Sequence, residues 1–390
     1  MKKIKKTIKN ILLKICSLCV KVICFVLPLN RNIIIFNSYY GQKYDDSPAN
    51  IADAIHTINN KILLYWSTNN KNITIPNYVK VVLRKSLKEK FIFSRAKVIV
   101  SNVRTWFPTK IKKNQIYIQT WHGSFALKQI EGQIENKLDR KYVDKAKYDG
   151  SVCTAILSSN SLDNALYKEA FWLNSKCEIL KYGLPRNDFI INNSNNDKIK
   201  RAIRKKIGLG YDDFVILFAP TFRNTMSANN LKLDYYSILR CFEAKTKKRC
   251  KLLIRVHSSE QHLVNELKFD DSILDGTNNL EMQELSLICD VLITDYSSTV
   301  HDYLILGKPI LLYLPDFDSY IEERGLSRNF YDNPFVKAYN FKELLELIDS
   351  VSIDNLSKIS STIYNSIESY ENGNASQNVA KWILIKISKL

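Results

Sequence analysis

Short runs of apolar residues recur along the chain and alternate with longer segments in which polar and apolar residues mix. The run Val291-Leu292-Ile293 contains no polar alternation, which is typical of a strand buried on both faces. Strands alternating with helices predict an α/β fold, with parallel sheets covered by helices on both faces. Further runs of this kind predict strands at 33–36, 62–66, 78–83, 97–101, 115–119, 154–157, 214–218 and 251–256.

The strand and helix rhythm occurs twice, with a polar and then basic segment between the two occurrences at 191–210. A chain of 390 residues is also too long for one ordinary hydrophobic core. We therefore expect one Rossmann-like domain over 31–190 and a second over 191–390. The charged segment 139–150 is expected to be a mobile connection.

The N-terminal segment 1–30 is basic and apolar. The first 31 residues hold eight Lys or Arg and no acidic residue, and Lys14 and Lys21 interrupt the apolar run, which makes a membrane-spanning helix unfavourable. We expect a basic amphipathic helix lying on an anionic membrane surface. A signal peptide is a weaker alternative, because no small-residue cleavage site follows. An ordinary first helix packed on the domain remains open.

The charge balance predicts an anionic partner. The chain has 57 Lys+Arg against 39 Asp+Glu, a net charge of +18, which suits a membrane surface, a nucleic acid or a phosphorylated substrate. A nucleic-acid partner is not expected, because no clustered aromatic and basic face of the RRM or OB kind is present. The eight cysteines form no pair of CxxC units, so no zinc site is expected.

Polar residues follow several predicted strands directly. His122 follows 115–119, Arg223 follows 214–218, His257 follows 251–256, and the turn 295–299 follows 291–293. Ligands of open α/β sheets bind beyond the carboxyl ends of the strands, and a helix start offers unpaired N–H groups to an anion. An arginine can fork a phosphate, and an imidazole can take a proton from a hydroxyl.

This set of residues suits transfer from a nucleotide diphosphate donor to an alcohol. Neither a GxxxxGK[ST] loop nor a GxGxxG fingerprint occurs, which argues against a P-loop NTPase and the usual dinucleotide fold. Structural alternatives remain: Ser297 and Ser298 as simple helix caps, and His122 as a histidine bonded to a backbone carbonyl.

Several separated motifs occur in a characteristic order and carry a resemblance to a known family. They are QTWHG at 119–123, GLPRND at 183–188, APTFR at 219–223, His257, and DVLITDYSSTVHDYLILGKP at 290–309 followed by Asp316, Tyr320, Arg324 and Gly325. Together they resemble the CDP-glycerol glycerophosphotransferase family, which includes teichoic-acid primases and polymerases and capsule-building relatives. The resemblance covers the chain from about residue 31 onward.

The resemblance implies a GT-B type arrangement, in which two Rossmann-like domains face a cleft. It implies transfer of glycerol phosphate or ribitol phosphate from CDP-glycerol or CDP-ribitol to a hydroxyl of a lipid-linked or polysaccharide acceptor, with release of CMP. Domain 31–190 would lie on the acceptor side and domain 191–390 would bind the CDP-alditol. No cofactor or metal is implied, and the location would be peripheral, on the cytoplasmic face of the membrane. The oligomeric state stays open.

The same resemblance assigns roles to residues of this chain. His122 would be the base or would orient the acceptor, and His257, the second catalytic histidine, would be a donor-phosphate ligand. Arg186 is expected to pair with Asp188, with closure of the cleft floor as the alternative role. His301, a departure from the family pattern like Ser258, is expected to be half-exposed. A GT-B glycosyltransferase using a nucleotide sugar is the rival. The donor ligands would be Arg223, Asp295, Ser297, Ser298, Thr299, Asp302, Asp316 and Arg324. Alternative roles stay open for two of them: Asp295 as a cap of the turn and Asp302 as a residue that orients it.

Overall fold

The computed structural model describes residues 19–104, 106–221, 233–256, 258–278 and 280–388. Most of the predicted N-terminal helix therefore lies outside the described residues. Residues 19–26 are helical, and Val22, Ile23, Phe25 and Val26 in this segment are at least half exposed. Among the helices of the described ranges, none has both the length and the apolar character needed to cross a membrane.

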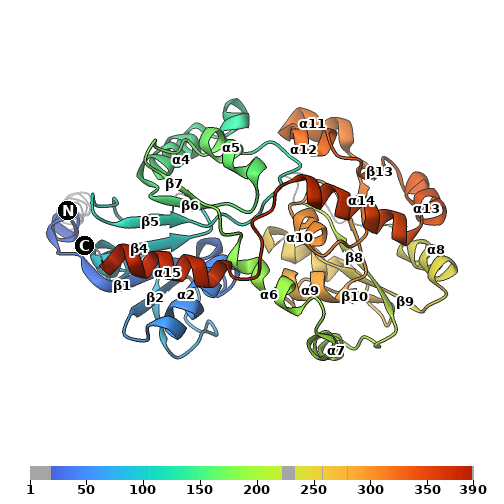
Figure 1. The fold of residues 1–390 in the computed structure, drawn as a ribbon, viewed down its shortest axis with the longest axis horizontal. Coiled ribbons are helices and arrows are strands. Elements are labelled where there is room, and N and C mark those ends of the chain that lie inside the picture. Colours follow the sequence, from blue (N-terminus) through green and yellow to red (C-terminus); the bar gives the residue numbers. More distant parts are fainter. Residues whose placement is uncertain (1–18, 105, 222–232, 257, 279, 389–390) are drawn as a thin grey trace, which may run out of the picture.

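Within the described residues the chain forms two parallel sheets (Figure 1). The first has seven strands in the order β3-β2-β1-β4-β5-β6-β7 and the second has six in the order β10-β9-β8-β11-β12-β13. The strands of the first sheet are β1 (Asn30–Asn37), β2 (Leu63–Thr68), β3 (Val79–Leu83), β4 (Ala96–Ser101), β5 (Ile116–Gln119), β6 (Ala155–Leu157) and β7 (Glu178–Leu180). Those of the second are β8 (Phe214–Ala219), β9 (Cys250–Ile254), β10 (Ile273–Asp275), β11 (Val291–Thr294), β12 (Ile310–Tyr313) and β13 (Val336–Ala338).

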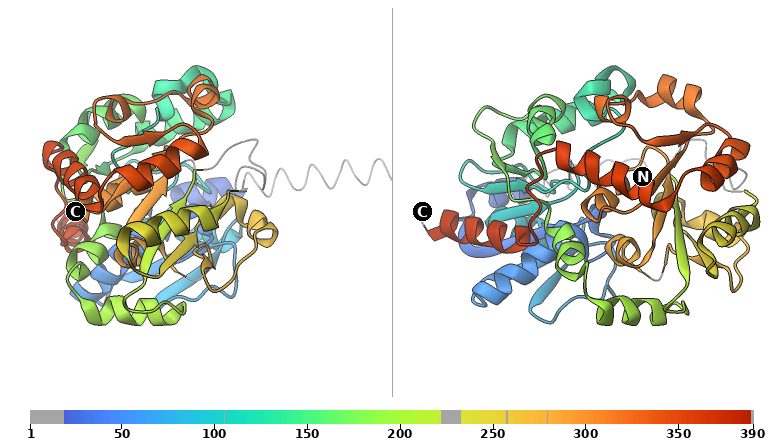
Figure 2. Two further views of the ribbon diagram at one scale, coloured as in Figure 1. Left: turned by 90° about the vertical axis from the view of Figure 1, so that its right-hand side faces the viewer. Right: turned by 45° about the vertical axis from the view of Figure 1, so that its right-hand side comes forward.

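Helices cover both faces of each sheet (Figures 1 and 2). With the first half of the chain come α2 (Asp46–Ile58), α3 (Leu87–Arg95), α4 (Arg140–Val152), α5 (Ser161–Ala170) and α6 (Asp188–Asn193). With the second come α7 (Asp197–Lys206), α8 (Tyr235–Thr246), α9 (Met282–Ile288), α10 (Thr299–Ile305), α11 (Phe317–Arg324), α12 (Arg328–Tyr331), α13 (Phe341–Ser350), α14 (Ile353–Ser366) and α15 (Ala375–Ser388). Short 3₁₀ segments are η1 (Tyr39–Gly41), η2 (Glu131–Lys137), η3 (Pro185–Asn187) and η5 (Ser258–Glu266).

The apolar runs become strands because both of their faces are covered. Every residue of β4, β8 and β11 is buried, as expected for the inner strands of a parallel sheet. Side chains of β11 alternate between two separate cores, with Leu292 in one and Val291 and Ile293 in the other. The predicted fold class, two Rossmann-like α/β units that face a cleft, is confirmed.

Each sheet reverses its strand order once, between β1 and β4 in the first and between β8 and β11 in the second. Such a reversal leaves a crevice at the carboxyl ends of the two strands, because the following loops turn to opposite faces. The segments that leave these strands begin at Ser38, Asn102, Pro220 and Asp295. The topology thus marks two crevices, one in each half, as the places where ligands bind.

The last helix crosses back to the first half. Val379, Ala380 and Ile383 of α15 pack into the core between the first sheet and α2, and Figures 1 and 2 show α15 lying over that half. A division of the chain at residue 190 follows the two sheets but not this helix. The halves are therefore tied by a second connection as well as by the segment around α6.

The segment 139–150 is a helix, so its prediction as a mobile connection was wrong. It forms α4, whose first turn is capped by Asp139 through a 3.0 Å bond from Tyr142 N. Val143 and Ala146 are buried, and the buried carboxylate of Asp149 pairs with Arg104 at 3.3 Å. The apolar stripe of α4 is narrow, and the charged residue Asp149 occupies one of its buried positions. The helical pattern was therefore not evident in the sequence.

Candidate active site

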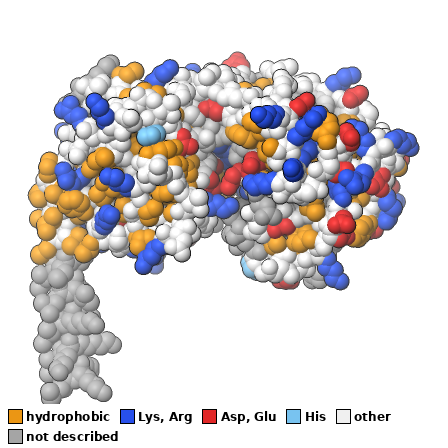
Figure 3. All heavy atoms as spheres, turned by 90° about the horizontal axis from the view of Figure 1, so that it is seen from below, with side chains coloured by type: hydrophobic (Ala, Val, Ile, Leu, Met, Phe, Trp, Pro, Cys, Tyr) orange, Lys and Arg blue, Asp and Glu red, His pale blue; other side chains and the backbone are white. Residues whose placement is uncertain are grey.

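A cavity of about 200 Å³ lies between the two halves, where both crevices open. Figure 3 shows acidic side chains gathered in the hollow between the halves, with basic side chains beside them. We call the cavity of about 200 Å³ the first cavity. The first half lines it with Tyr39, Lys43, Asp45, Asp46, His122 and Arg186. The second half lines it with Thr221, Arg255, Glu281, Ser297, Ser298 and Thr299.

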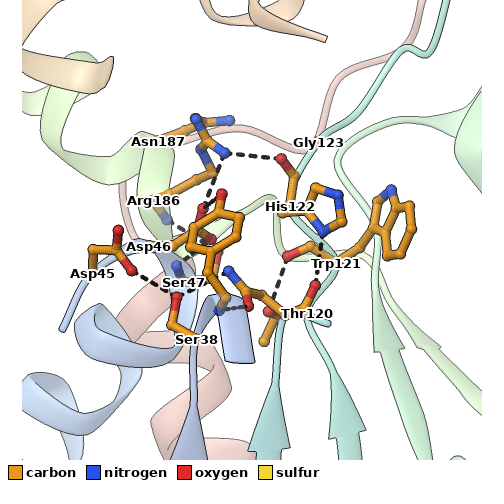
Figure 4. Close-up of polar contacts among 12 residues, drawn as sticks. Ser38, Asp45, Asp46, Ser47, Thr120, Trp121, His122, Gly123, Arg186 and Asn187 are labelled. Carbon is orange, nitrogen blue, oxygen red and sulfur yellow. Dashed lines mark hydrogen bonds and ion pairs between the residues drawn. The ribbon is translucent and has the colours of Figure 1, made fainter. Parts of the chain in front are cut away.

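His122 lies beyond the end of β5, with its ring fixed by the neighbouring strand end. Nδ1 is 2.8 Å from the carbonyl oxygen of Asn102, which follows β4 (Figure 4). A carbonyl oxygen only accepts, so Nδ1 carries the proton, and in the neutral ring Nε2 keeps its lone pair. Burial lowers the pKa of His122 below its ordinary 6.5. The ring is therefore neutral at pH 7 and can accept a proton at Nε2.

The loop that carries His122 is held in an unusual backbone conformation. Trp121 and Phe125, on either side of His122, have positive φ angles of 54° and 50°. Such angles cost a non-glycine residue of order 1–3 kcal/mol, so the surroundings must over-determine them. The buried carboxylate of Asp163, in the first turn of α5, accepts from Ser124 Oγ and from Phe125 N. Tyr167 OH donates to the Gly123 carbonyl at 3.3 Å.

The turn after β11 faces this loop from the second half. Ser297 Oγ accepts from Thr299 N at 3.2 Å in the turn before α10, Ser298 is the N-cap residue of the helix, and both serines line the cavity. The two halves touch here: a Cβ added to Gly123 would lie 2.6 Å from Ser298 Oγ. No side chain fits at that distance, so glycine is required for this close approach. The backbone of Gly123 and the side chain of Ser298, which are 175 residues apart in the sequence, thus meet at one point.

Arg186 connects the two halves on the floor of the first cavity. Its Nη1 lies 3.0 Å from Asp46 and donates to the His122 carbonyl at 2.9 Å (Figure 4). Its Nη2 lies 3.4 Å from Asp302. The expected pairing with Asp188 was wrong, because that carboxylate instead accepts from Ala375 N and Ser376 N at the start of α15.

Asp302 is buried against Arg186 and lines neither of the two cavities described for this interface. Burial raises its pKa to about 6, although the Arg186 guanidinium opposes that rise. Its position on α10, one turn after Ser298, makes it part of the ion-pair floor. Its assignment as a donor ligand stays a prediction.

Several cavity residues, among them Arg255, Asp45 and Glu281, were missed by the sequence analysis. Arg255, directly after β9, donates from Nη1 to the carbonyls of Gly276 and Leu280 at 2.9 and 2.7 Å, which fixes its guanidinium in the wall. Asp45 and Glu281 bring carboxylates from opposite halves, and burial raises the pKa of Asp45 to about 7. The available signal was position alone, since each residue follows a strand or begins a helix.

The remaining predicted residues are placed as follows. Asp295 accepts from Thr221 N and Oγ1 at 2.8–3.0 Å and so ties the ends of β11 and β8 together behind the cavity. Asp316 and Arg324 stand at the two ends of α11, which Tyr320 holds by stacking on Tyr296 at 3.7 Å, and neither lines the two cavities. Their roles as donor ligands stay predictions. Arg223 and His257 lie outside the described residues.

His301 is buried, which corrects the expectation of a half-exposed side chain. It is 1% exposed, and its Nε2 lies 3.2 Å from Ser159 Oγ in the other half of the chain. Burial lowers its pKa to about 3, so the ring is neutral. It is a contact between the halves on the side of α10 away from the first cavity.

Among the described residues, no group of three or more His, Cys, Asp or Glu side chains is arranged to hold a metal ion. The first cavity instead offers the hydroxyls of Ser297, Ser298 and Thr299 and the guanidinium of Arg255. These are ligands for oxyanions, and they lie opposite a neutral imidazole.

The model of one protein family, CDP-Glycerol:Poly(glycerophosphate) glycerophosphotransferase, matches residues 19–385. The chain belongs to this family. It is thus a glycerophosphotransferase-type enzyme, and the resemblance seen in the sequence motifs is confirmed.

Several relatives of this glycerophosphotransferase are named for teichoic acid synthesis. A teichoic acid poly(glycerol phosphate) polymerase of Staphylococcus epidermidis is 30% identical over 90% of this chain and 50% of its own length. A teichoic acid glycerol-phosphate transferase of Staphylococcus aureus is 28% identical over 91% of this chain and 93% of its own. The chain therefore spans half of the first relative and nearly all of the second.

A solved structure gives the same fold. The wall teichoic acid polymerase TagF superposes with a TM-score of 0.84 at 27% identity, covering 100% of this chain and 98% of that chain. Another structure of TagF was obtained after a soak with CDPG. The two-sheet architecture of this chain is thus the architecture of that polymerase.

Proposed function

We propose that this enzyme transfers an alditol phosphate, glycerol phosphate or ribitol phosphate, from a CDP-alditol to a hydroxyl of a teichoic-acid-like or capsule-like acceptor. The observation that carries the proposal is the meeting of His122 with the turn 297–299 across one cavity. The names of the relatives supply the donor and polymer class, since they include both glycerol-phosphate and ribitol-phosphate polymerases.

The proposed reaction is a displacement at the β-phosphorus of the donor. The acceptor hydroxyl oxygen forms a bond to that phosphorus, and the bond from phosphorus to the bridging oxygen breaks. The bridging oxygen leaves with its electron pair as part of CMP, and the hydroxyl proton passes to His122 Nε2. A neutral imidazole is required for this step, and the lowered pKa of His122 keeps it neutral at physiological pH.

The second half of the chain supplies the groups that hold the diphosphate. The hydroxyls of Ser297 and Ser298, in the turn before α10, donate to phosphate oxygens. Arg255 adds a fixed positive charge to the same wall. These donors are set before the reaction, so they stabilise the charge that develops on the transferred group without reorganising.

The carboxylates of the cavity fit the hydroxyl-rich parts of the donor. Asp45 already accepts from Ser38 Oγ at 2.6 Å, and Glu281 faces it from the second half. Carboxylate oxygens accept several hydrogen bonds, so they can accept from ribose or alditol hydroxyls. We assign the diphosphate to the turn that contains Ser297 and Ser298, which we call the serine turn. The hydroxyls of the ribose and the alditol are assigned to the side of the cavity with Asp45 and Glu281.

Release of CMP tests the proposal. The purified full chain is incubated with CDP-glycerol or CDP-ribitol and a poly(glycerol phosphate) or poly(ribitol phosphate) acceptor, and we expect CMP together with a new phosphodiester. Nucleotide sugars are tested in parallel. If UDP or GDP appears with a glycosidic product, and no CMP appears from either CDP-alditol, the proposal is wrong.

We also propose that the protein is peripheral to the cytoplasmic face of the membrane. The exposed apolar side chains Val22, Ile23, Phe25 and Val26 stand next to a strongly basic N-terminal sequence, a combination that suits anionic lipid. Deletion of residues 2–28 should release the protein from anionic vesicles. Unchanged pelleting with vesicles would contradict this location.

A further inference from the structure

A second cavity, of about 140 Å³, adjoins the first cavity at His122. Residues of the first half form most of it, and they come from the loop after β5 and from α5. The residues that give it its character are Trp121, Lys128, Ile130 and Leu166. His122, Thr221, Ser297 and Ser298 line both cavities, so they form the partition between them.

We propose that the second cavity is the acceptor subsite and takes the hydroxyl-bearing end of a polyol phosphate chain. This inference rests on the proposed function and deepens it, since it assigns the two substrates to opposite sides of His122. A donor phosphate held at Ser297 and Ser298 and an acceptor hydroxyl in the second cavity would meet at the partition. His122 is part of that partition and can take the hydroxyl proton there.

Geometry favours the acceptor over the donor in this cavity. In a displacement at phosphorus the attacking and leaving oxygens lie roughly in line, so they approach from opposite sides. Of the donor-binding groups, Ser297 and Ser298 stand on the partition, whereas Thr299 and Arg255 line the first cavity and not the second. The leaving CMP therefore occupies the first cavity, and the attacking oxygen comes from the second.

The lining of the second cavity matches a polyol phosphate. Trp121, Ile130 and Leu166 give an apolar wall on which the carbon face of a polyol can pack. Lys128 supplies the positive charge, and this charge also helps to lower the pKa of His122. A cation beside an apolar wall suits a chain in which polyol units alternate with anionic phosphodiesters.

The loop that forms the cavity is rigid and is anchored in both halves. Lys128 pairs with Leu326 as an isolated β-bridge, and Ser327 N donates to the Leu127 carbonyl at 3.0 Å. Asp163 and Tyr167 hold the other end of the loop at Ser124 and Gly123. The cavity is therefore built with its shape fixed before a ligand arrives, which reduces the entropic cost of binding.

Filling the cavity tests the proposal. Leu166→Trp places a larger side chain in the second cavity, and Leu162→Trp places the same side chain at a 42% exposed position of the same helix. Donor affinity is measured by calorimetry with CDP-glycerol and CDP-ribitol. Acceptor KM is measured with short soluble poly(glycerol phosphate) and poly(ribitol phosphate). We expect L166W to raise the acceptor KM at least about tenfold with unchanged donor affinity, and L162W to change neither.

A charge variant gives a second readout for the case in which L166W does not fold. Lys128→Gln should raise the acceptor KM and weaken its dependence on salt, whereas Lys168→Gln, at an exposed position of α5, should do neither. A loss of donor affinity in L166W or K128Q would place the donor in this cavity and overturn the inference. It is also overturned if both variants keep the wild-type acceptor KM, or if wild-type protein that binds a CDP-alditol transfers to neither polymer. Failure to bind either CDP-alditol would instead refute the proposed function itself.

Discussion

The two halves of this glycerophosphotransferase share one strand order but present different chemistry at their crevices. The first half presents an imidazole on a loop with two left-handed residues, held by buried carboxylates and a buried ion-pair cluster. The second presents a short hydroxyl turn and a helix start, held by the bond from Thr221 to Asp295. One fold thus supplies both a positioned base and an anion site, and the loops after the strands make the difference.

Rigidity is distributed according to these tasks. A base must be aimed at one atom, so the first half stores backbone strain and fixes it with bonds from α5. An anion site needs donors that converge on a phosphate, which a helix start provides without strain. The contact between Gly123 and Ser298 sets the distance between the two sites.

Removal of the imidazole should have the largest effect. His122→Ala should lower kcat by about 10²–10⁴-fold, because the base is lost, while donor affinity and the thermal unfolding midpoint stay near wild type. The control is His56→Ala, since His56 lies on α2 and its ring stacks on Tyr78. In the wild type, kcat/KM should fall at low pH with an apparent pKa below 6.5, because burial lowers the pKa of His122. Activity of H122A within a few fold of wild type would contradict its role.

A methyl group at the contact between the halves should have the next largest effect. Gly123→Ala brings a Cβ to 2.6 Å from Ser298 Oγ and 2.8 Å from its Cβ, so the halves must separate. Displacement of the base by about 1 Å can cost about 10²-fold in kcat. Measured in a Ser298→Gly background, the same substitution should cost much less, because the opposing atoms are gone. Equal losses in both backgrounds would show that the contact does not set the geometry.

The smallest effect on turnover is expected for a change at Glu371, which contacts the first half of the chain through Ser159. Glu371, between α14 and α15, is buried and accepts from Ser159 Oγ at 2.5 Å, Asn187 Nδ2 at 2.8 Å and Leu184 N at 3.1 Å. Burial raises its pKa from 4.5 to about 8. The folded state therefore binds this proton more tightly, so the contribution of Glu371 to stability is full below pH 4.5 and is lost as pH rises to 8.

Glu371→Gln should remove this dependence. We expect the free energy of unfolding of the wild type to fall as pH rises between 4.5 and 8, by at most about 1.4 kcal/mol per pH unit, and E371Q to show a flatter profile. Glu368→Gln, an exposed neighbour, should keep the wild-type profile. Denaturant titrations at a series of pH values measure both, and identical profiles for wild type and E371Q would refute the assignment.

The sequence was sufficient for the fold because the inner strands are uniformly apolar and the turns are polar. It also brought His122 and the turn 297–299 together, since strand ends on one edge of each sheet converge. The sequence did not reveal the helix at 139–150, because Asp149 occupies a buried helical position there through its pair with Arg104. Hydrophobic periodicity cannot register a buried ion pair, because the partner lies elsewhere in the chain.

The same limit explains the errors within the site. Arg186 was paired with its sequence neighbour Asp188, whereas its partners Asp46 and Asp302 are more than 100 residues away. The side chain of His301 was expected to be half-exposed, yet the other half of the chain covers it. Contacts between the halves decide both positions, and local sequence contains no information on how two domains meet.

The central claim is that a diphosphate held by the second half lies under the imidazole of the first. A crystal structure of the full chain with bound CDP-glycerol or CDP-ribitol tests it most directly. We expect the donor β-phosphate to contact Ser297, Ser298 and the start of α10, with His122 Nε2 facing it from the side of the second cavity. A donor whose diphosphate lies away from this turn, or beyond the reach of His122, would contradict the account.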